Sequence, residues 1–168
     1  MGFQRGNAPL AGSQGSALSG ILKGGALKCH PPLINDRRYN MAKITLRKTR
    51  ETRVRGGHPW IYASEIERVE GEFENGDIVD VADFRGKFIG RGFYNPASQI
   101  SLRILTRNDE PCDRAFFAKR IQDAWDYRKL LCDPDSCRLI YSESDFLPGL
   151  VVDKFGDVLV MQSLSLGI

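Results

Sequence analysis

The chain has 168 residues, of which 42% are hydrophobic and 27% charged, values typical of a globular protein. This length accommodates one ordinary domain or two small ones. The net charge of +3 is too small to indicate nucleic-acid binding by itself, and no apolar run approaches the length of a membrane span. We therefore expect a folded protein with no membrane partner.

Residues 1–40 differ in composition from the rest of the chain. They hold seven of the 17 glycines, few aromatic residues and no hydrophobic period. Ala17 to Leu27 is too weakly apolar for a signal-peptide core, and the arginines are too few for a typical transit peptide. We predict a disordered extension over 1–40, with ordered structure and a natural start near Met41.

The cysteines indicate the compartment rather than a metal site. The chain has four cysteines, Cys29, Cys112, Cys132 and Cys137, and their spacing matches no zinc-binding signature. Without a secretory signal we expect reduced thiols and a cytoplasmic protein.

A basic run precedes a sharp turn in the first part of the folded region. Its five cations are Arg47, Lys48, Arg50, Arg53 and Arg55, offset only by Glu51, and Gly56-Gly57-His58-Pro59-Trp60 follows. Such a segment is typical of a surface that binds phosphates. A solvated basic face explains the same charges, and charge alone leaves both interpretations open.

Several short strands with turn signals between them predict a small barrel. The expected strands are 44–49, 77–82, 87–94 and 99–107, and 59–66 is expected to be a short helix or turn. Gly90 and Gly92 lie inside the third of these strands. Glycine there marks a bulge, a bend, or the close approach of another backbone.

The pattern changes to a long helix after Asp113, a plausible N-cap. The period predicts a helix from Arg114 to Leu131, with Phe117, Ile121, Ala124 and Leu131 on its apolar face. A strand at 138–143 and a hairpin of 150–153 with 157–164 follow. The last apolar strand would leave an unpaired edge, so the sequence looks cut there, and a homodimer or other self-association through this edge is open.

Recognisable catalytic motifs are missing from the sequence. His58 has no neighbouring nucleophile, and the glycines do not open a helix after a strand as a dinucleotide site requires. Glu143, Asp145 and Asp153 are interpreted as turn and surface-pairing residues rather than as an acid–base cluster. We predict no catalytic, cofactor or metal site in this chain.

Three segments form a recognisable series: Arg53-x-x-x-Gly57-His58-Pro59-Trp60-Ile61, Gly76-Asp77-Ile78-Val79-Asp80-Val81, and Gly90-x-Gly92-x-x-Asn95-Pro96-x-Ser98-x-Ile100-x-x-Arg103. They resemble the N-terminal part of the SAM-dependent methyltransferases that modify cytosine C5 in large-subunit ribosomal RNA. Arg138 to Phe155, with Ser142-Glu143-Ser144-Asp145-Phe146-Leu147-Pro148-Gly149, resembles the small α/β domain of these enzymes. The resemblance covers about residue 43 to the end.

The resemblance implies an α+β chain with a PUA-type β pseudo-barrel at 43–108, followed by a strand-helix-hairpin segment at 112–168 that is truncated at its C-terminal end. No complete Rossmann domain is expected. S-adenosylmethionine and the catalytic cysteine belong to a further domain of the family, so no cofactor is expected here. Ribosomal RNA is the implied partner. The candidate RNA-binding residues are Arg47, Lys48, Arg50, Arg53, Arg55, His58, Arg91, Tyr94, Asn95 and Arg103.

Three hypotheses remain open at this point. The chain is an RNA-binding fragment of such an enzyme, a complete methyltransferase whose sequence is cut short, or a stand-alone PUA module without methyltransferase activity. Whether the chain is itself an enzyme is therefore not decided by its sequence.

Overall fold

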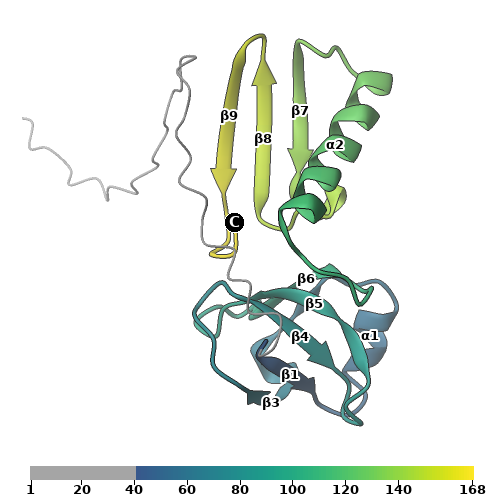
Figure 1. Ribbon diagram of the computed structural model, residues 1–168, viewed down its shortest axis with the longest axis vertical. Coiled ribbons are helices and arrows are strands. Elements are labelled where there is room, and N and C mark those ends of the chain that lie inside the picture. Colours follow the sequence, from purple (N-terminus) through teal and green to yellow (C-terminus); the bar gives the residue numbers. More distant parts are fainter. Residues whose placement is uncertain (1–40) are drawn as a thin grey trace, which may run out of the picture.

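The computed structural model describes residues 41–168 and contains two β-sheets with one long helix (Figure 1). The predicted extension at 1–40 lies outside the described residues. The α+β class is confirmed. Within the described part of the chain no doubly wound parallel sheet occurs, because β1 (Lys43–Leu46) and β4 (Ile78–Ala82) form the one parallel strand pair.

The first sheet has six strands in the order β2-β6-β5-β4-β1-β3 and curls into a half-barrel (Figure 1). Its strands are β1 (Lys43–Leu46), β2 (Trp60–Ile61), β3 (Ile66–Glu70), β4 (Ile78–Ala82), β5 (Phe88–Tyr94) and β6 (Leu102–Thr106). Alternate residues of these strands meet inside the curl, among them Ile44, Val79 and Leu102, which are fully buried. Val54, from the short helix α1 (Glu51–Arg55), joins this core.

Gly90 and Gly92 permit the close packing of β5 on β6. A β-carbon on Gly90 would lie 2.4 Å from the carbonyl oxygen of Thr106, and one on Gly92 would lie 2.2 Å from that of Arg103. The register of the pair shifts between Arg91 and Gly92. The expected close backbone approach is therefore confirmed.

Helix α2 (Arg114–Leu131) begins and ends where the sequence predicts. The Asp113 side chain caps it by accepting a hydrogen bond from the backbone amide of Phe116. The helix packs on β7 (Ser136–Tyr141) and β8 (Leu150–Phe155) of a three-stranded antiparallel sheet that β9 (Val158–Ser163) completes. The 3-10 helix η2 (Ser142–Asp145) connects β7 to the turn before β8.

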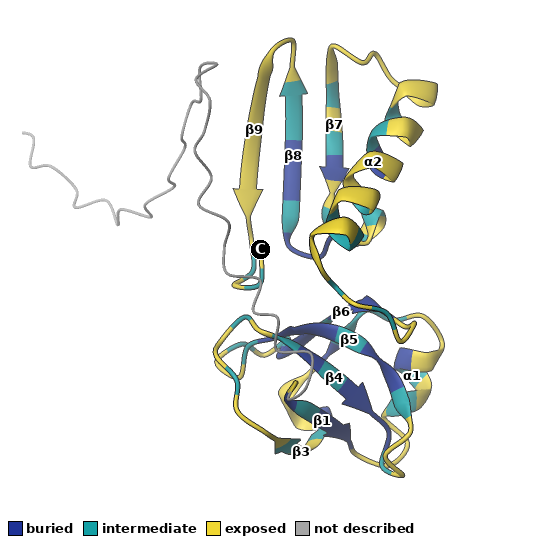
Figure 2. Cartoon of the chain, in the orientation of Figure 1, coloured by how far each residue is buried: buried dark blue, intermediate teal, exposed yellow. Residues whose placement is uncertain are grey.

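The hydrophobic core between α2 and the second sheet is small, and part of the predicted apolar face of α2 lies outside it. Ala124 is buried against Ile140, Leu147 and Val152, and Phe117 packs at its margin. Ile121 is 42% exposed and Leu131 63% exposed, so the prediction that they share a buried apolar face with Ala124 is wrong. A three-stranded sheet is too narrow to cover the whole apolar stripe of a helix of this length. Figure 2 shows the resulting exposed outer surface of α2.

Three further segments differ from the sequence prediction. Strand β1 ends at Leu46, because Thr49 has a left-handed backbone (φ 74°) and a turn leads into α1, which was not predicted. The predicted helix or turn at 59–66 instead contains β2, a 3-10 turn at Ala63–Glu65 and the start of β3. Strand β6 starts at Leu102, since Asn95 and Ser101 close a loop through a backbone hydrogen bond. None of the helices in residues 41–168 is long and apolar enough to cross a membrane.

Candidate nucleic-acid interface

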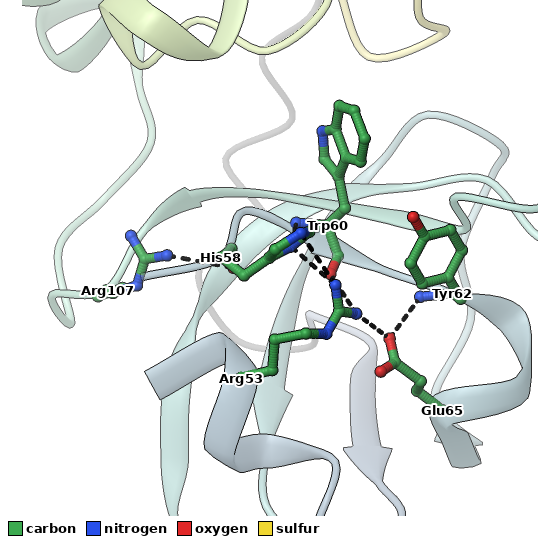
Figure 3. A network of polar contacts seen from close by, with 6 residues as sticks. All are labelled: Arg53, His58, Trp60, Tyr62, Glu65 and Arg107. Carbon is green, nitrogen blue, oxygen red and sulfur yellow. Dashed lines mark hydrogen bonds and ion pairs between the residues drawn. The ribbon is translucent and has the colours of Figure 1, made fainter. Parts of the chain in front are cut away.

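Arg53 and His58 hold the turn between α1 and β2 through a network of polar contacts (Figure 3). The Arg53 guanidinium donates to the backbone oxygen of Trp60 at 3.0 Å and to the carboxylate of Glu65 at 2.5 Å, and Glu65 is 7% exposed. His58 Nδ1 accepts a hydrogen bond from the backbone amide of Trp60 at 3.1 Å and lies 2.9 Å from Nη1 of Arg53. Pairing with a nearly buried carboxylate fixes Arg53 in place, so its charge serves the fold.

Arg55 is likewise engaged in an ion pair, which anchors α1 to the turn between β4 and β5. It donates to Asp83 Oδ2 at 2.8 Å, while Asp83 Oδ1 accepts the backbone amides of Arg85 and Lys87. The hydrogen bond from Lys87, together with those from Arg85 and Arg55, lowers the pKa of the Asp83 carboxyl despite the opposing effect of burial.

The remaining cations of the basic run are exposed and carry no carboxylate partner among residues 41–168. Arg47 donates only to the backbone oxygen of Ile66, at 3.1 Å, and Lys48 Nζ lies 5.9 Å from the centre of the Phe84 ring. The guanidinium of Arg85 lies over the same ring at 5.1 Å. We call the group Arg47, Lys48, Arg50 and Arg85 the basic surface.

Sequence reasoning missed Arg85, because it sits in a turn 35 residues after Arg50 and only the fold brings it to Lys48. The available signal was the turn Asp83-Phe84-Arg85-Gly86, which presents a cation beside an aromatic residue.

The second group of predicted contacts lies on β5, the loop after it and β6, and its side chains are engaged within the chain. Arg91 pairs with Asp80 and Asp109, each at 2.7 Å. Tyr94 is 5% exposed and meets the Phe73 ring edge-on at 4.9 Å between centroids. Burial raises the pKa of its hydroxyl. Tyr94 is therefore a core residue and does not stack on a base. The Asn95 side chain accepts the backbone amide of Ala97 and so closes its own turn.

Arg103 contributes to a junction between the two sheets. Glu143 of η2 accepts hydrogen bonds from Arg103 at 2.9 Å and from the Trp60 indole at 2.7 Å. The Arg103 guanidinium also lies 5.6 Å from the centre of the Trp60 ring. Burial raises the pKa of Glu143, but hydrogen bonds from Ser142 and Trp60 and the charge of Arg103 outweigh it and lower the pKa overall. The carboxylate therefore remains charged and holds the sheets together.

One small cavity does bring together three of the predicted residues. It is lined by Tyr94, Asn95 and Arg103, together with residues 164–167. Its volume of about 60 Å³ holds a water or two and no nucleobase. Three of the predicted residues are thus brought together, yet around a space too small for the predicted ligand.

The carboxylates that could have served acid–base chemistry are paired separately. Each forms an ion pair with an arginine: Glu143 with Arg103 at 2.9 Å, Asp145 with Arg128 at 2.6 Å and Asp153 with Arg138 at 2.8 Å. The pair of Arg138 and Asp153 lies on the surface as predicted, whereas the other two pairs are partly buried. Burial raises the pKa of the Cys112 thiol to about 11, so it is a poor nucleophile. Among the described residues no cluster of His, Cys, Asp and Glu could hold a metal ion.

Comparisons with known proteins place these observations in a family context. Residues 44–107 match the PUA-like domain family. The chain is 43% identical over 129 residues to "Ribosomal RNA large subunit methyltransferase I" from Escherichia coli O139:H28 and from Shigella boydii serotype 18. That match covers 74% of this chain and 33% of each relative, so the chain spans about a third of their length.

Two solved methyltransferase structures share the fold. One, assigned as a SAM-dependent methyltransferase from Streptococcus mutans, aligns with a TM-score of 0.62 at 15% identity over 73% of this chain and 33% of that one. The other, a methyltransferase in complex with SAH, aligns with a TM-score of 0.63 at 15% identity over 73% and 32%. At this identity the likeness concerns the fold alone.

Proposed function

Since this chain carries a PUA-like domain and is homologous to large-subunit ribosomal RNA methyltransferases, we propose that it is the RNA-binding N-terminal part of a SAM-dependent ribosomal RNA (cytosine-C5) methyltransferase. In this proposal residues 43–108 form the RNA-binding domain and 112–168 the following α/β domain, in the cytoplasm. The chain positions ribosomal RNA for a catalytic domain that lies outside it and binds S-adenosylmethionine.

The observation that carries the proposal is the contrast among the cations of the basic run. Arg53 and Arg55 are neutralised by Glu65 and Asp83. The basic surface of Arg47, Lys48, Arg50 and Arg85 has no such partner within the described residues, although Asp and Glu are abundant in the chain. Exposed cations without a carboxylate nearby attract phosphates, and their contacts release counterions from RNA.

The aromatic residues near the candidate contacts offer this surface no stacking partner for a base. Tyr94 and Phe93 are buried, and Trp60 is half-buried against Glu143. The basic surface is therefore proposed to track the RNA backbone without reading bases. Such contacts fix the position of the RNA and supply affinity that depends strongly on salt.

The salt dependence of RNA binding tests this proposal. We expect K48A/R50A to weaken binding to a structured ribosomal RNA fragment and to reduce the slope of log Kd against log salt by roughly 2, about one unit per lost phosphate contact. Neither side chain donates a hydrogen bond to another described residue, so the fold should persist.

The matched control is R68A/K129A, which removes the same charge from exposed residues paired with Glu70 and Asp126. Its slope should stay close to that of the wild type. Equal slopes for the wild type and K48A/R50A would refute phosphate binding at the basic surface.

A further inference from the structure

A broad groove lies between α2 and η2, on the second domain and away from the basic surface. Its volume is about 700 Å³, within the range of sites that bind small organic molecules. Three aromatic side chains line it: Phe116, Tyr127 and Phe146. The proposed function does not involve this groove.

Phe146 is in an unfavourable position for a residue that serves only the fold. Its backbone is left-handed, with φ 58° and ψ 27°, at the C-cap of η2. That conformation is strained for a residue with a side chain of this kind, whereas glycine adopts it freely. The ring is nevertheless 62% exposed, so it recovers little hydrophobic stabilisation. The strain and the exposure together indicate that the ring contacts something outside the chain.

Arg120 supports the Phe146 ring from one side. Its guanidinium lies 4.4 Å from the centre of the Phe116 ring and 5.2 Å from that of Phe146. It donates to the backbone oxygens of Leu105 at 3.1 Å and Phe146 at 3.3 Å, so both flanking elements hold it in place. The result is a stack of ring, guanidinium and ring that ends in an exposed aromatic face.

The other groove residues favour a flat, polar ligand over an apolar segment of protein. Two ion pairs border the groove, Lys119 with Asp123 and Arg128 with Asp145, each at 2.6 Å. An apolar protein surface would have to desolvate the exposed pair of Lys119 and Asp123, whereas the pair of Arg128 and Asp145 is already nearly buried. A nucleobase presents an aromatic face to the rings and hydrogen-bonding edges to the carboxylates and guanidinium groups.

We propose that this groove binds an unpaired nucleotide of RNA, with its base stacked on Phe146 and flanked by Tyr127. This inference rests on the proposed RNA-binding function and extends it, because the basic surface tracks the backbone whereas the groove selects single-stranded RNA. The second domain is then a participant in RNA binding rather than a spacer.

The strained backbone of Phe146 makes a sharp test available. Phe146→Gly removes the ring and relieves the left-handed strain at the same time, so the variant should fold at least as well as the wild type. Loss of one base-stacking contact should raise the Kd of the full chain for a short single-stranded RNA by roughly 5- to 100-fold. Tyr127→Ala should have a smaller effect in the same direction. Binding to a duplex of the same sequence should not change.

Two controls and the salt slope separate this inference from the proposed function. Phe146→Tyr keeps an aromatic ring and should retain the affinity, and Phe155→Ala removes a ring of similar exposure (56%) on β8 without effect. The slope against salt should be unaltered in Phe146→Gly, because no phosphate contact is lost.

Unchanged single-stranded affinity in Phe146→Gly, with weakened binding in K48A/R50A, would overturn the groove assignment and leave the proposed function standing. A change in self-association in place of RNA affinity would instead assign the groove to a protein partner and overturn the inference. No RNA binding by the wild type would overturn both.

Discussion

Cations of equal charge in the basic run differ in what they contact, and this difference decides their role. Arg53 reaches Glu65, twelve residues later, and Arg55 reaches Asp83, which follows 28 residues after it. Lys48 and Arg50 are exposed and form no ion pair with a carboxylate of the described residues. A paired, partly buried arginine stabilises the fold, whereas an exposed and unpaired cation is available to a ligand.

The Asp83 carboxylate gives the first domain a measurable response to acid. Its pKa in the folded chain lies below the ordinary value of 3.8, so its ionised form stabilises the fold above that pH. This contribution is lost as the pH falls through the lowered pKa. Asp83→Asn should therefore reduce the Tm at pH 7, and the difference from the wild type should shrink below pH 3.8, as thermal melts across pH would record.

The control for this measurement is Asp157→Asn, which alters an exposed carboxylate in the β8–β9 turn with no hydrogen-bond partner among the described residues. It should leave the Tm unchanged at every pH. A constant difference between Asp83→Asn and the wild type down to low pH would contradict the role assigned to the charge.

The basic run was evident in the sequence, but the sequence could not separate its paired cations from its unpaired ones. Charge density is local, while the partners of Arg53, Arg91 and Arg103 lie 12, 18 and 40 residues away in Glu65, Asp109 and Glu143. The same limit applies to Tyr94, which alternation places in a strand without revealing that the curl of the sheet buries it. The RNA-binding role of the unpaired cations stays a prediction.

Elements with strong local signals were predicted well, and those formed by tertiary contacts were not. Helix α2 has an N-cap at Asp113, a regular period and Pro134 beyond its end, so its bounds follow from the sequence. Helix α1 has Val54 as its single buried residue and therefore no period. Strand β3 shows no alternation of burial, because Glu67 forms a bulge opposite Thr45 and Leu46 of β1 and shifts the register of the pair.

The glycines of β5 provide a test at the level of a strand pair. Gly92→Ala should destabilise the chain by roughly 1–3 kcal/mol, because its β-carbon would meet the backbone of Arg103, which cannot move without opening the β5–β6 pair. Urea unfolding would measure the loss.

Gly56→Ala is the matched control for that substitution. Gly56 has φ −73°, which alanine adopts readily, and its nearest atom, the oxygen of Thr52, would lie 3.3 Å from the new β-carbon. The free energy of unfolding of Gly56→Ala should differ from that of the wild type by less than about 1 kcal/mol. Equal effects of the two substitutions would show that the close approach at Gly92 does not constrain the sheet.

At the scale of the whole molecule, the second sheet ends in an open apolar edge. All six residues of β9 are exposed, and β9 pairs with β8 alone within the described residues (Figure 2). Val158, Leu159, Val160 and Met161 carry no charge, and the strand contains no proline. Proteins usually protect such an edge, because its free backbone groups pair readily with a strand of another chain.

We predict that this edge pairs with a second copy of this chain, since two β9 strands could pair antiparallel and extend the sheet across both copies. We expect sedimentation velocity to show association that increases with protein concentration, and Val160→Lys to weaken it by placing a charge on the edge. Leu130→Lys adds the same charge on α2, at an 82% exposed site away from β9, and should associate like the wild type. If both lysine variants weakened association equally, net charge rather than the strand edge would govern it.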